Sequence, residues 1–203
     1  MDKNAPDVLL VNSSARYKDS STRRFADELI TSLSKQHGEL NLRERDVAEG
    51  IPFVDEHWVE ANFTPAEERT KEHQQVLSYS DSLVDELEVA DIIILAVPVY
   101  NYSVPASLKS WIDQISRVGR TFNFTSEGSF GKLKNKKAYV IMTTGGMKLG
   151  SDVDFASGYL CHMLNFIGIE DISFLSAEGL MMDDENGIQH MRSQIDNLAS
   201  KAA

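Results

Sequence analysis

Cysteine is almost absent from this sequence, because Cys161 is the only one among 203 residues. A single thiol excludes an intramolecular disulfide and any site built from several cysteines, which fits a reducing compartment. Long apolar runs are also missing, since the longest, Ile92 to Tyr100, contains Pro98 and is far shorter than the roughly 20 residues of a membrane span. The short acidic segment before Val8 leaves no room for a secretory signal peptide. We therefore expect a cytoplasmic protein that has no membrane partner.

Positive charge is in deficit, because 20 Lys and Arg face 31 Asp and Glu and give a formal net charge of -11. Such a surface repels a phosphate backbone, and no basic stripe offsets that repulsion, so we expect no nucleic-acid partner. Any anionic ligand must be met by local positive groups rather than by the overall field.

Two kinds of binding motif are missing as well. No G-x-G occurs among the 12 glycines, and no P-loop motif is present, which disfavours both a dinucleotide-binding Rossmann site and a P-loop. The acidic segment 183–187 has neither the ligand spacing nor the closing acid of a calcium loop, so it predicts a turn. We expect no metal site.

Short apolar runs alternate with helical patterns along the chain. Continuous apolar runs that begin at Val8, Ile92 and Ala138 predict strands buried on both faces, and a fourth run begins at Ile172. The segment from Glu39 to Val47 alternates apolar and polar residues, as a half-exposed edge strand does. Helical spacing predicts helices over 22–34, 67–89, 106–118, 155–167 and 188–199.

This order of elements predicts one α/β domain over residues 1–203, with a doubly wound, flavodoxin-like sheet of five parallel strands in the order 2-1-3-4-5. The segments Ile51–Glu67 and Val118–Lys137 read as long aromatic loops. They either serve function or cover the core or a subunit interface.

Three loops follow buried strands and should meet at the carboxyl edge of the sheet, where ligands bind in this fold class. The first loop gathers hydroxyl groups and cations: Ser13, Ser14, Ser20, Ser21 and Thr22, with Arg16 and Lys18. Hydroxyls at a helix N-terminus suit a phosphate. The alternative for Ser21 or Thr22 is a plain N-cap.

The second loop, 98–105, reads "PVYNYSVP", and the third, 143–146, reads "TTGG". Aromatic rings beside Asn101 offer a planar ligand a stacking surface and an amide that both donates and accepts. Paired glycines let a flat ligand approach the backbone. The alternatives are a helix that starts at Pro105 with its tyrosines in the core, and an ordinary glycine turn.

Together these loops resemble one family, the bacterial FMN-dependent NADH azoreductases and quinone reductases, whose older label is acyl carrier protein phosphodiesterase. The resemblance extends over nearly the whole chain and is carried by "VLLVNSSARYKDSS", "DIIILAVPVYNYSVPASLKSWIDQ", "KKAYVIMTTGGM" and "LNFIGIEDISFLSAEGL". This sequence has Val99 where methionine is frequent, Tyr102 where phenylalanine is frequent, and Phe124 where some members carry tyrosine.

The resemblance implies an FMN cofactor, NADH as reductant, a quinone or azo acceptor, ping-pong hydride transfer and a homodimer. It implies that the FMN phosphate is held by Ser14, Ser20, Ser21 and Thr22. It implies that the ribityl chain and ring are held by the second loop, with Pro98, Val99, Tyr100, Asn101 and Tyr102. It implies that the third loop, with Thr143, Thr144, Gly145 and Gly146, lies along the ring. Phe122, Phe124 and Phe166 are then candidates for the substrate pocket. Two alternatives are a hydrolase, as the older label suggests, and a flavodoxin-type electron carrier without its own substrate.

Overall fold

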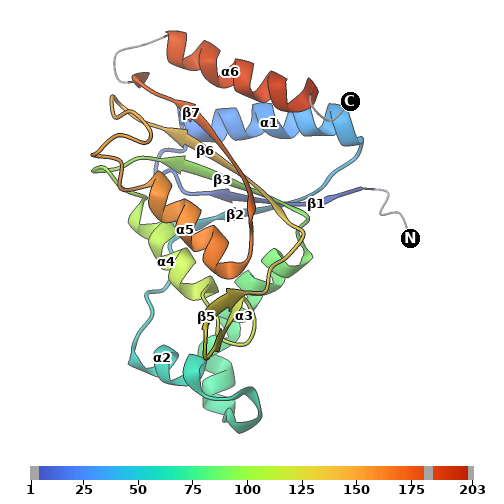
Figure 1. Cartoon of the computed structure of the whole chain (residues 1–203), viewed down its shortest axis with the longest axis vertical. Coiled ribbons are helices and arrows are strands. Elements are labelled where there is room, and N and C mark those ends of the chain that lie inside the picture. The colour runs from blue at the N-terminus through green and yellow to red at the C-terminus, as the bar shows by residue number, and fades with distance from the viewer. Residues whose placement is uncertain (1–4, 181–184, 201–203) are drawn as a thin grey trace.

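The computed structural model describes residues 5–180 and 185–200, and its centre is a twisted parallel sheet (Figure 1). The sheet order is β2-β1-β3-β6-β7. The strands are β1 (Asp7–Asn12), β2 (Asn41–Asp46), β3 (Ile92–Pro98), β6 (Lys137–Thr143) and β7 (Asp171–Ala177). The flavodoxin-like α/β fold with five parallel strands is thus confirmed. Counted among parallel strands alone, the order matches the predicted 2-1-3-4-5, and the labels differ because a separate hairpin supplies β4 and β5.

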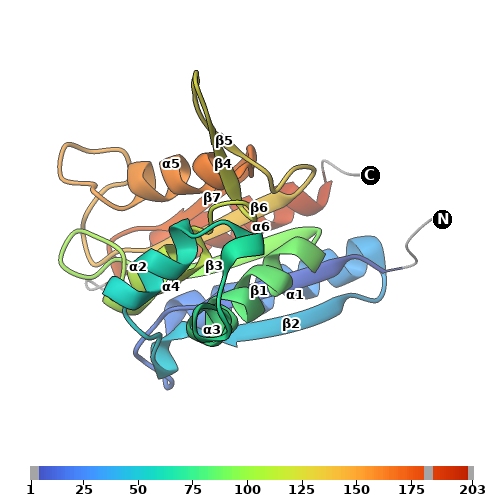
Figure 2. The ribbon, with the colours of Figure 1, turned by 90° about the horizontal axis from the view of Figure 1, so that it is seen from below.

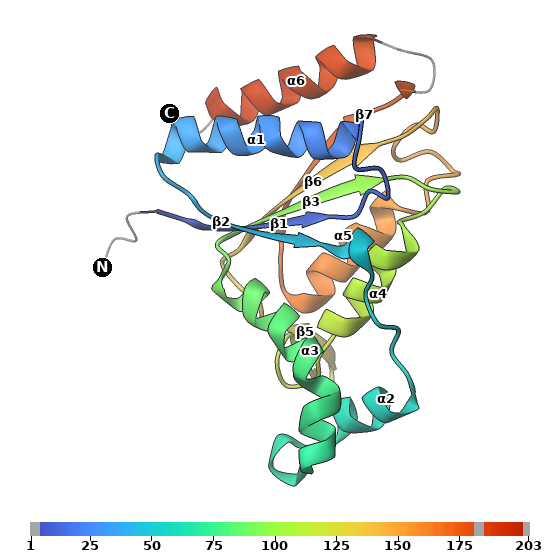
Figure 3. The same cartoon turned by 180° about the vertical axis from the view of Figure 1, so that it is seen from behind.

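Helices cover both faces of the sheet. They are α1 (Ser21–His37), α2 (Glu56–Phe63), α3 (Lys71–Val89), α4 (Ala106–Ile115), α5 (Ser157–Ile167) and α6 (Glu185–Ser200). Helices α1 and α6 lie on one face, and α3, α4 and α5 lie on the other (Figures 1 and 3). No helix within the described ranges combines the length and the apolar character needed to cross a bilayer.

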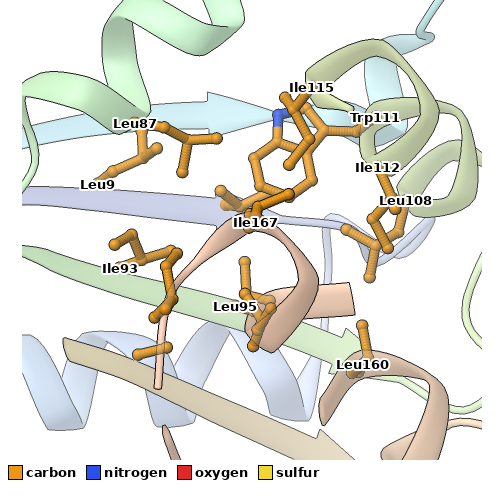
Figure 4. Packing of buried hydrophobic residues seen from close by; sticks show 14 of the residues in the cluster. Leu9, Leu87, Ile93, Leu95, Leu108, Trp111, Ile112, Ile115, Leu160 and Ile167 are labelled. Carbon is orange, nitrogen blue, oxygen red and sulfur yellow. The ribbon is translucent and has the colours of Figure 1, made fainter. Parts of the chain in front are cut away.

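Strand β3 explains why the apolar runs are continuous. Its seven residues are all buried, because odd and even side chains enter different layers of the core. Ile93 and Leu95 face α3, α4 and α5, where they pack with Leu87 and Trp111 (Figure 4). Ile94 belongs to the other layer, which is formed with α1 and α6.

The two segments predicted as long loops contain regular structure. The first holds α2, and the predicted helix over 67–89 begins at Lys71, because the side chain of Thr70 caps it by accepting from the His73 N–H. A separate 3₁₀ turn, Ala66–Glu68, precedes that cap. The helix predicted over 106–118 ends at Ile115.

The second segment holds a hairpin, β4 (Phe122–Thr125) and β5 (Gly128–Gly131), which projects away from the sheet and helices (Figure 2). It seats on the end of α5, where Leu133 N–H donates to the Ile167 carbonyl at 2.9 Å. A Cβ on Gly131 would stand 2.0 Å from the backbone nitrogen of Gly168, so the two backbones touch directly. Of the predicted turn over 183–187, residues 183 and 184 lie outside the described residues, and the other three begin α6.

A buried arginine ties α2 to the rest of the fold. Arg117 is fully buried, and its Nε donates to the Asn62 side-chain oxygen at 3.1 Å. Its Nη1 donates to Ser80 Oγ at 2.8 Å and pairs with Asp81 at 2.9 Å. Burial lowers the pKa of this guanidinium, and the Asp81 carboxylate opposes that shift. The contacts fix α2 against α3.

Candidate functional site

The three loops singled out in the sequence follow β1, β3 and β6, which are neighbours in the sheet. Because these strands are parallel, their carboxyl ends lie at the same edge, at the side toward which the arrowheads of β3 and β6 point in Figure 1. Strand order reverses between β1 and β3, which is where ligands bind in doubly wound sheets.

A pocket of about 270 Å³ opens between these loops. Its lining is Ser14, Arg16, Asp19, Ser20, Ser21, Thr22, Pro98, Val99, Tyr100, Thr143, Thr144 and Leu180. A neighbouring pocket of about 630 Å³ shares Tyr100 and is lined also by Asn101, Ser103, Val104, Pro105, Ala106, Lys109, Phe155 and Tyr159. The fold therefore gathers all three loops around one continuous region.

The hydroxyl loop ends at the N-terminus of α1, and Ser20 is the N-cap. Its Oγ accepts from the Arg23 N–H at 3.5 Å and lies 3.2 Å from Thr22 Oγ1. The cap is therefore neither Ser21 nor Thr22, and both of these residues line the pocket. The first turn of α1 contains no acidic residue, so the helix dipole adds to the donors there; Asp19, just before the cap, also lines the pocket and is balanced by Arg16. This end of the pocket suits an anion.

Tyr100 connects the first two loops. Its hydroxyl accepts from the Ala15 N–H at 3.3 Å and lies 3.5 Å from Ser14 Oγ. Its backbone forms two hydrogen bonds with Ser103, at 3.0 and 3.1 Å, which close a tight turn. The two central residues, Asn101 and Tyr102, have φ values of 50° and 67°, as in a type I′ turn. Tyr102 is 58% exposed, so it is not a core residue, and Pro105 is the N-cap of α4 rather than its first residue.

The third loop is held by backbone bonds at its start. Val99 N–H donates to the Thr143 carbonyl at 2.9 Å, and Thr144 N–H donates to the Ala177 carbonyl at 3.0 Å. Gly145 and Gly146 follow and line neither pocket. A Cβ on Gly146 would meet nothing within 4 Å, so the backbone here borders open space.

The three phenylalanines expected at the substrate pocket lie elsewhere. Phe122 packs against Phe166 with ring centroids 4.4 Å apart, and against Phe124 at 5.2 Å. Helix α5 starts at the carboxyl edge and is 11 residues long, so Phe166 near its far end lies about 13 Å along the helix from that edge. None of the three rings lines either pocket. Within one chain the structure does not bring them to the site.

Other pocket residues were missed by sequence reasoning. Leu180 follows β7, and the Glu178-Gly179 pair between them was not read as part of the site, although Gly179 has a positive φ of 74°. Tyr159 and Phe155 come from the start of α5, where they read as ordinary core or surface residues. Burial raises the pKa of Tyr159 to about 12, and the Asp113 carboxylate adds to that shift, so its hydroxyl is protonated at neutral pH. The sequence could have indicated these residues only by their place in the predicted fold, since each segment adjoins the carboxyl edge of the sheet.

Comparisons with known proteins agree with this architecture. The family model of the flavodoxin-like fold matches residues 6–199. FMN-dependent NADH:quinone oxidoreductase 1 of Hahella chejuensis is 44% identical over 188 residues, which cover 93% of this chain and 92% of the relative. The protein of the same name from Jannaschia sp. is 43% identical over 193 residues, which cover 95% of this chain and 98% of the relative.

A solved structure supports the fold. The FMN-dependent NADH-azoreductase of Bacillus anthracis, in complex with FMN, superposes with a TM-score of 0.84 at 24% identity, and the match covers 98% of this chain and 99% of that one. The family resemblance read from the three loops is confirmed. This chain belongs to the flavodoxin-like fold family and, within it, to the family of the FMN-dependent NADH:quinone oxidoreductases.

Proposed function

We propose that this protein is an FMN-dependent enzyme that passes a hydride from NADH to quinones or azo compounds. The observation that carries the proposal is the gathering of buried hydroxyls, a helix N-terminus and a strand-end tight turn in one region, in a chain 43% to 44% identical to named FMN-dependent NADH:quinone oxidoreductases. The solved structural relative named an azoreductase supports the second substrate class.

The donor set fits the phosphate of FMN. Ser14 and Thr22 are nearly fully buried, with exposures of 2% and 1%, yet both line the pocket together with Ser20 and Ser21. Hydroxyl groups donate to phosphate oxygens, and the free N–H groups of the first turn of α1 add further donors. Arg16 supplies the local positive charge that the acidic protein lacks overall.

The second and third loops fit the rest of the cofactor. We assign the ribityl chain and ring to the two loops together, with these residues: Pro98, Val99, Tyr100, Asn101, Tyr102, Thr143, Thr144, Gly145 and Gly146. The open backbone at Gly146 leaves room for a flat ring. FMN, when bound, supplies the hydride chemistry, while the chain binds and orients it.

The protein groups have electrostatic and positioning roles. Backbone N–H groups around Asn101 and Gly145 would hold the ring edge of bound FMN and would supply donors for negative charge there, as donors do at an oxyanion. NADH and the acceptor would occupy one site in turn, so we expect ping-pong kinetics. No side chain needs to act as an acid or base in the hydride step.

We propose that the enzyme is a homodimer. Phe124 is 60% exposed and Phe130 is 48% exposed, and both lie on the projecting hairpin (Figure 2). The register pairs Phe124 with Ser129 and Phe130 with Asn123, so the two rings lie on opposite faces of the hairpin. Large exposed apolar side chains on a projecting element favour an interaction surface. In a dimer, the hairpin of one copy would bring the exposed Phe124 to the pocket of the other. The buried Phe122 packs against both Phe124 and Phe166 of α5, so these two rings would support Phe124 rather than reach the partner's pocket themselves.

The two alternatives make different demands on the structure. A hydrolase needs an activated nucleophile, but Ser151, beside Gly150, has a buried Oγ with no hydrogen-bond partner among the described residues. A flavodoxin-type carrier needs an exposed ring edge and no substrate pocket, whereas the pocket beside Asn101 has a volume of about 630 Å³. Both observations favour the oxidoreductase.

The test is direct. The purified protein is mixed with FMN, and unbound FMN is then removed. The protein should show a flavin absorption spectrum and should oxidise NADH when a quinone is present. FMN binding without NADH oxidation would support the carrier. A colourless protein that cleaves a phosphodiester would support the hydrolase. The proposal extends to residues 1–203 as one FMN-binding domain, supported by the family match over 6–199, and the cytoplasmic location stays a prediction.

A further inference from the structure

Arg23 lies in the first turn of α1, and its guanidinium joins the loop after β1 to the end of β2. Nη2 donates to the backbone oxygen of Ser14 at 2.9 Å. The same nitrogen pairs with Asp46 Oδ2 at 2.8 Å. The guanidinium carbon lies 4.7 Å from the centre of the Tyr17 ring. The side chain is only 16% exposed, so these contacts are made largely out of water.

The end of β2 supplies the negative charge for this contact. Asp46 is in register with Asn12 across the sheet, and Glu44 precedes it on the same strand. Glu44 lies 4.0 Å from Arg23 Nη1 and accepts from the Asn12 side-chain amide at 2.7 Å. The guanidinium is therefore directed at two carboxylates, and Arg23 is absent from the lining of the pocket. It reaches the pocket only through the loop that it holds.

That loop has little backbone support of its own. From Ser14 to Asp19, no backbone hydrogen bond to another described backbone group is found. Its shape depends on three hydrogen bonds that involve side chains. The Arg23 guanidinium donates to the Ser14 carbonyl, and the Tyr100 hydroxyl accepts from the Ala15 N–H. The Ser14 Oγ accepts from the Arg16 N–H at 3.2 Å. A loop without these hydrogen bonds binds its ligand more weakly, because ordering the loop on ligand binding costs conformational entropy.

We propose that Arg23 is a positioning residue, which holds the loop 13–20 in the shape that receives the phosphate of FMN. This inference rests on the proposed function. A lysine cannot replace it fully, because one ammonium point charge does not reproduce the planar fork that meets Ser14 and Asp46 together.

The test compares two flavins that differ only in the phosphate. Dissociation constants for FMN and riboflavin are measured by quenching of flavin fluorescence, for the wild type and for Arg23→Met, Arg23→Lys and Arg24→Met. Arg24→Met is the matched control, because this substitution removes the same charge from the same helical turn. Arg24 itself is exposed and lines neither pocket of the site. Circular dichroism checks that each variant is folded.

We expect Arg23→Met to weaken FMN binding by about tenfold or more, because one charge-assisted hydrogen bond that holds the loop is lost. Riboflavin binding should change by less than about twofold, since the loop does not contact its ring. Arg23→Lys should lie between wild type and Arg23→Met, and Arg24→Met should match the wild type. The ³¹P resonance of bound FMN should broaden or shift in Arg23→Met, less so in Arg23→Lys, and not in Arg24→Met.

Several results would overturn the inference. Unchanged FMN binding by Arg23→Met, an equal loss for both flavins, or an equal loss in Arg24→Met would each exclude a positioning role. Failure of the wild type to bind FMN would instead refute the proposed function. If Arg23→Met does not fold, Asp46→Asn keeps the guanidinium but removes its ion pair, and it should weaken FMN selectively by a few-fold. No selective loss there would also overturn the inference.

Discussion

The turn at Asn101 and Tyr102 shows how single residues shape the site. Both have positive φ, a conformation that costs most side chains roughly 1–2 kcal/mol. Asparagine tolerates it better than other residues with a Cβ. Two such residues in succession, directly after a buried strand, indicate a backbone shape kept for binding rather than for stability.

Two substitutions at Asn101 separate its backbone role from its side-chain role. Asn101→Leu should lower the free energy of unfolding by about 1 kcal/mol, because leucine resists positive φ, whereas Asn101→Gly should leave it nearly unchanged. Both substitutions should weaken FMN binding, since both remove the side-chain amide of Asn101. Urea denaturation and flavin titration measure the two effects. Full FMN affinity in Asn101→Gly would show that the amide does not contact the cofactor.

The carboxylate of Asp154 organises the start of α5. It accepts from the N–H groups of Gly150, Ala156 and Ser157 at 2.8 to 3.0 Å. Burial acts to raise the pKa of Asp154, but these bonds and the Ser157 hydroxyl outweigh it and hold the pKa below its ordinary value. The carboxylate thus stabilises the helix that contributes Tyr159 to the site.

This cap predicts a pH dependence of stability. Because the pKa of Asp154 is lower in the folded state, its contribution is present above the unfolded pKa of about 3.9 and is lost as the pH falls through the folded value. Asp154→Asn should lower the free energy of unfolding by about 1 kcal/mol at pH 7, and this difference from wild type should shrink below about pH 4. The exposed Asp152→Asn is the control. A difference that stays constant down to pH 3 would contradict the assignment.

The hairpin depends on the contact between Gly131 and the end of α5. Gly131→Ala should destabilise the protein by about 3 kcal/mol or more, because its Cβ would overlap the backbone nitrogen of Gly168, and neither backbone moves freely. Gly158→Ala is the matched control, since its Cβ would meet nothing within 4 Å. Thermal and urea unfolding measure both. Equal stability of the two variants would mean that the hairpin does not seat as described.

At the level of the whole molecule, the acidic surface and the exposed hairpin act in different ways. The net charge of -11 keeps copies apart unless a specific apolar contact outweighs the repulsion. Phe124 and Phe130 are the exposed aromatic residues on that hairpin. In the proposed dimer, the aromatic hairpin of each copy would cover the pocket of the other.

Phe124→Asp should therefore shift the protein from dimer to monomer in sedimentation velocity and reduce NADH:quinone activity at least about tenfold, because a buried charge opposes the apolar contact. Leu42→Asp is the control. It adds the same charge to an exposed apolar residue of β2, at the opposite edge of the sheet from β7. A monomeric wild type, or equal dissociation of both variants, would refute the proposed interface.

Much of the fold was predictable, because the central strands have a residue pattern that can be recognised within a short stretch of sequence. Strands β1, β3 and β6 are covered on both faces, so their apolar runs are unbroken and stand out. The hairpin was missed because its strands are four residues long and leave most side chains exposed. Helix α2 was missed because its residues gain stability from long-range contacts, such as that of Asn62 with Arg117.

The succession of strands and helices along the chain and the chemistry of the three loops were determined by the sequence itself, because each depends on residue types within a short stretch of chain. Three-dimensional packing alone decided which of these residues meet. It joined Tyr100 to the first loop, placed the phenylalanines at the far end of α5, and set Arg23 between β2 and the loop. Such contacts join residues distant along the chain, and no local pattern of residue types encodes them.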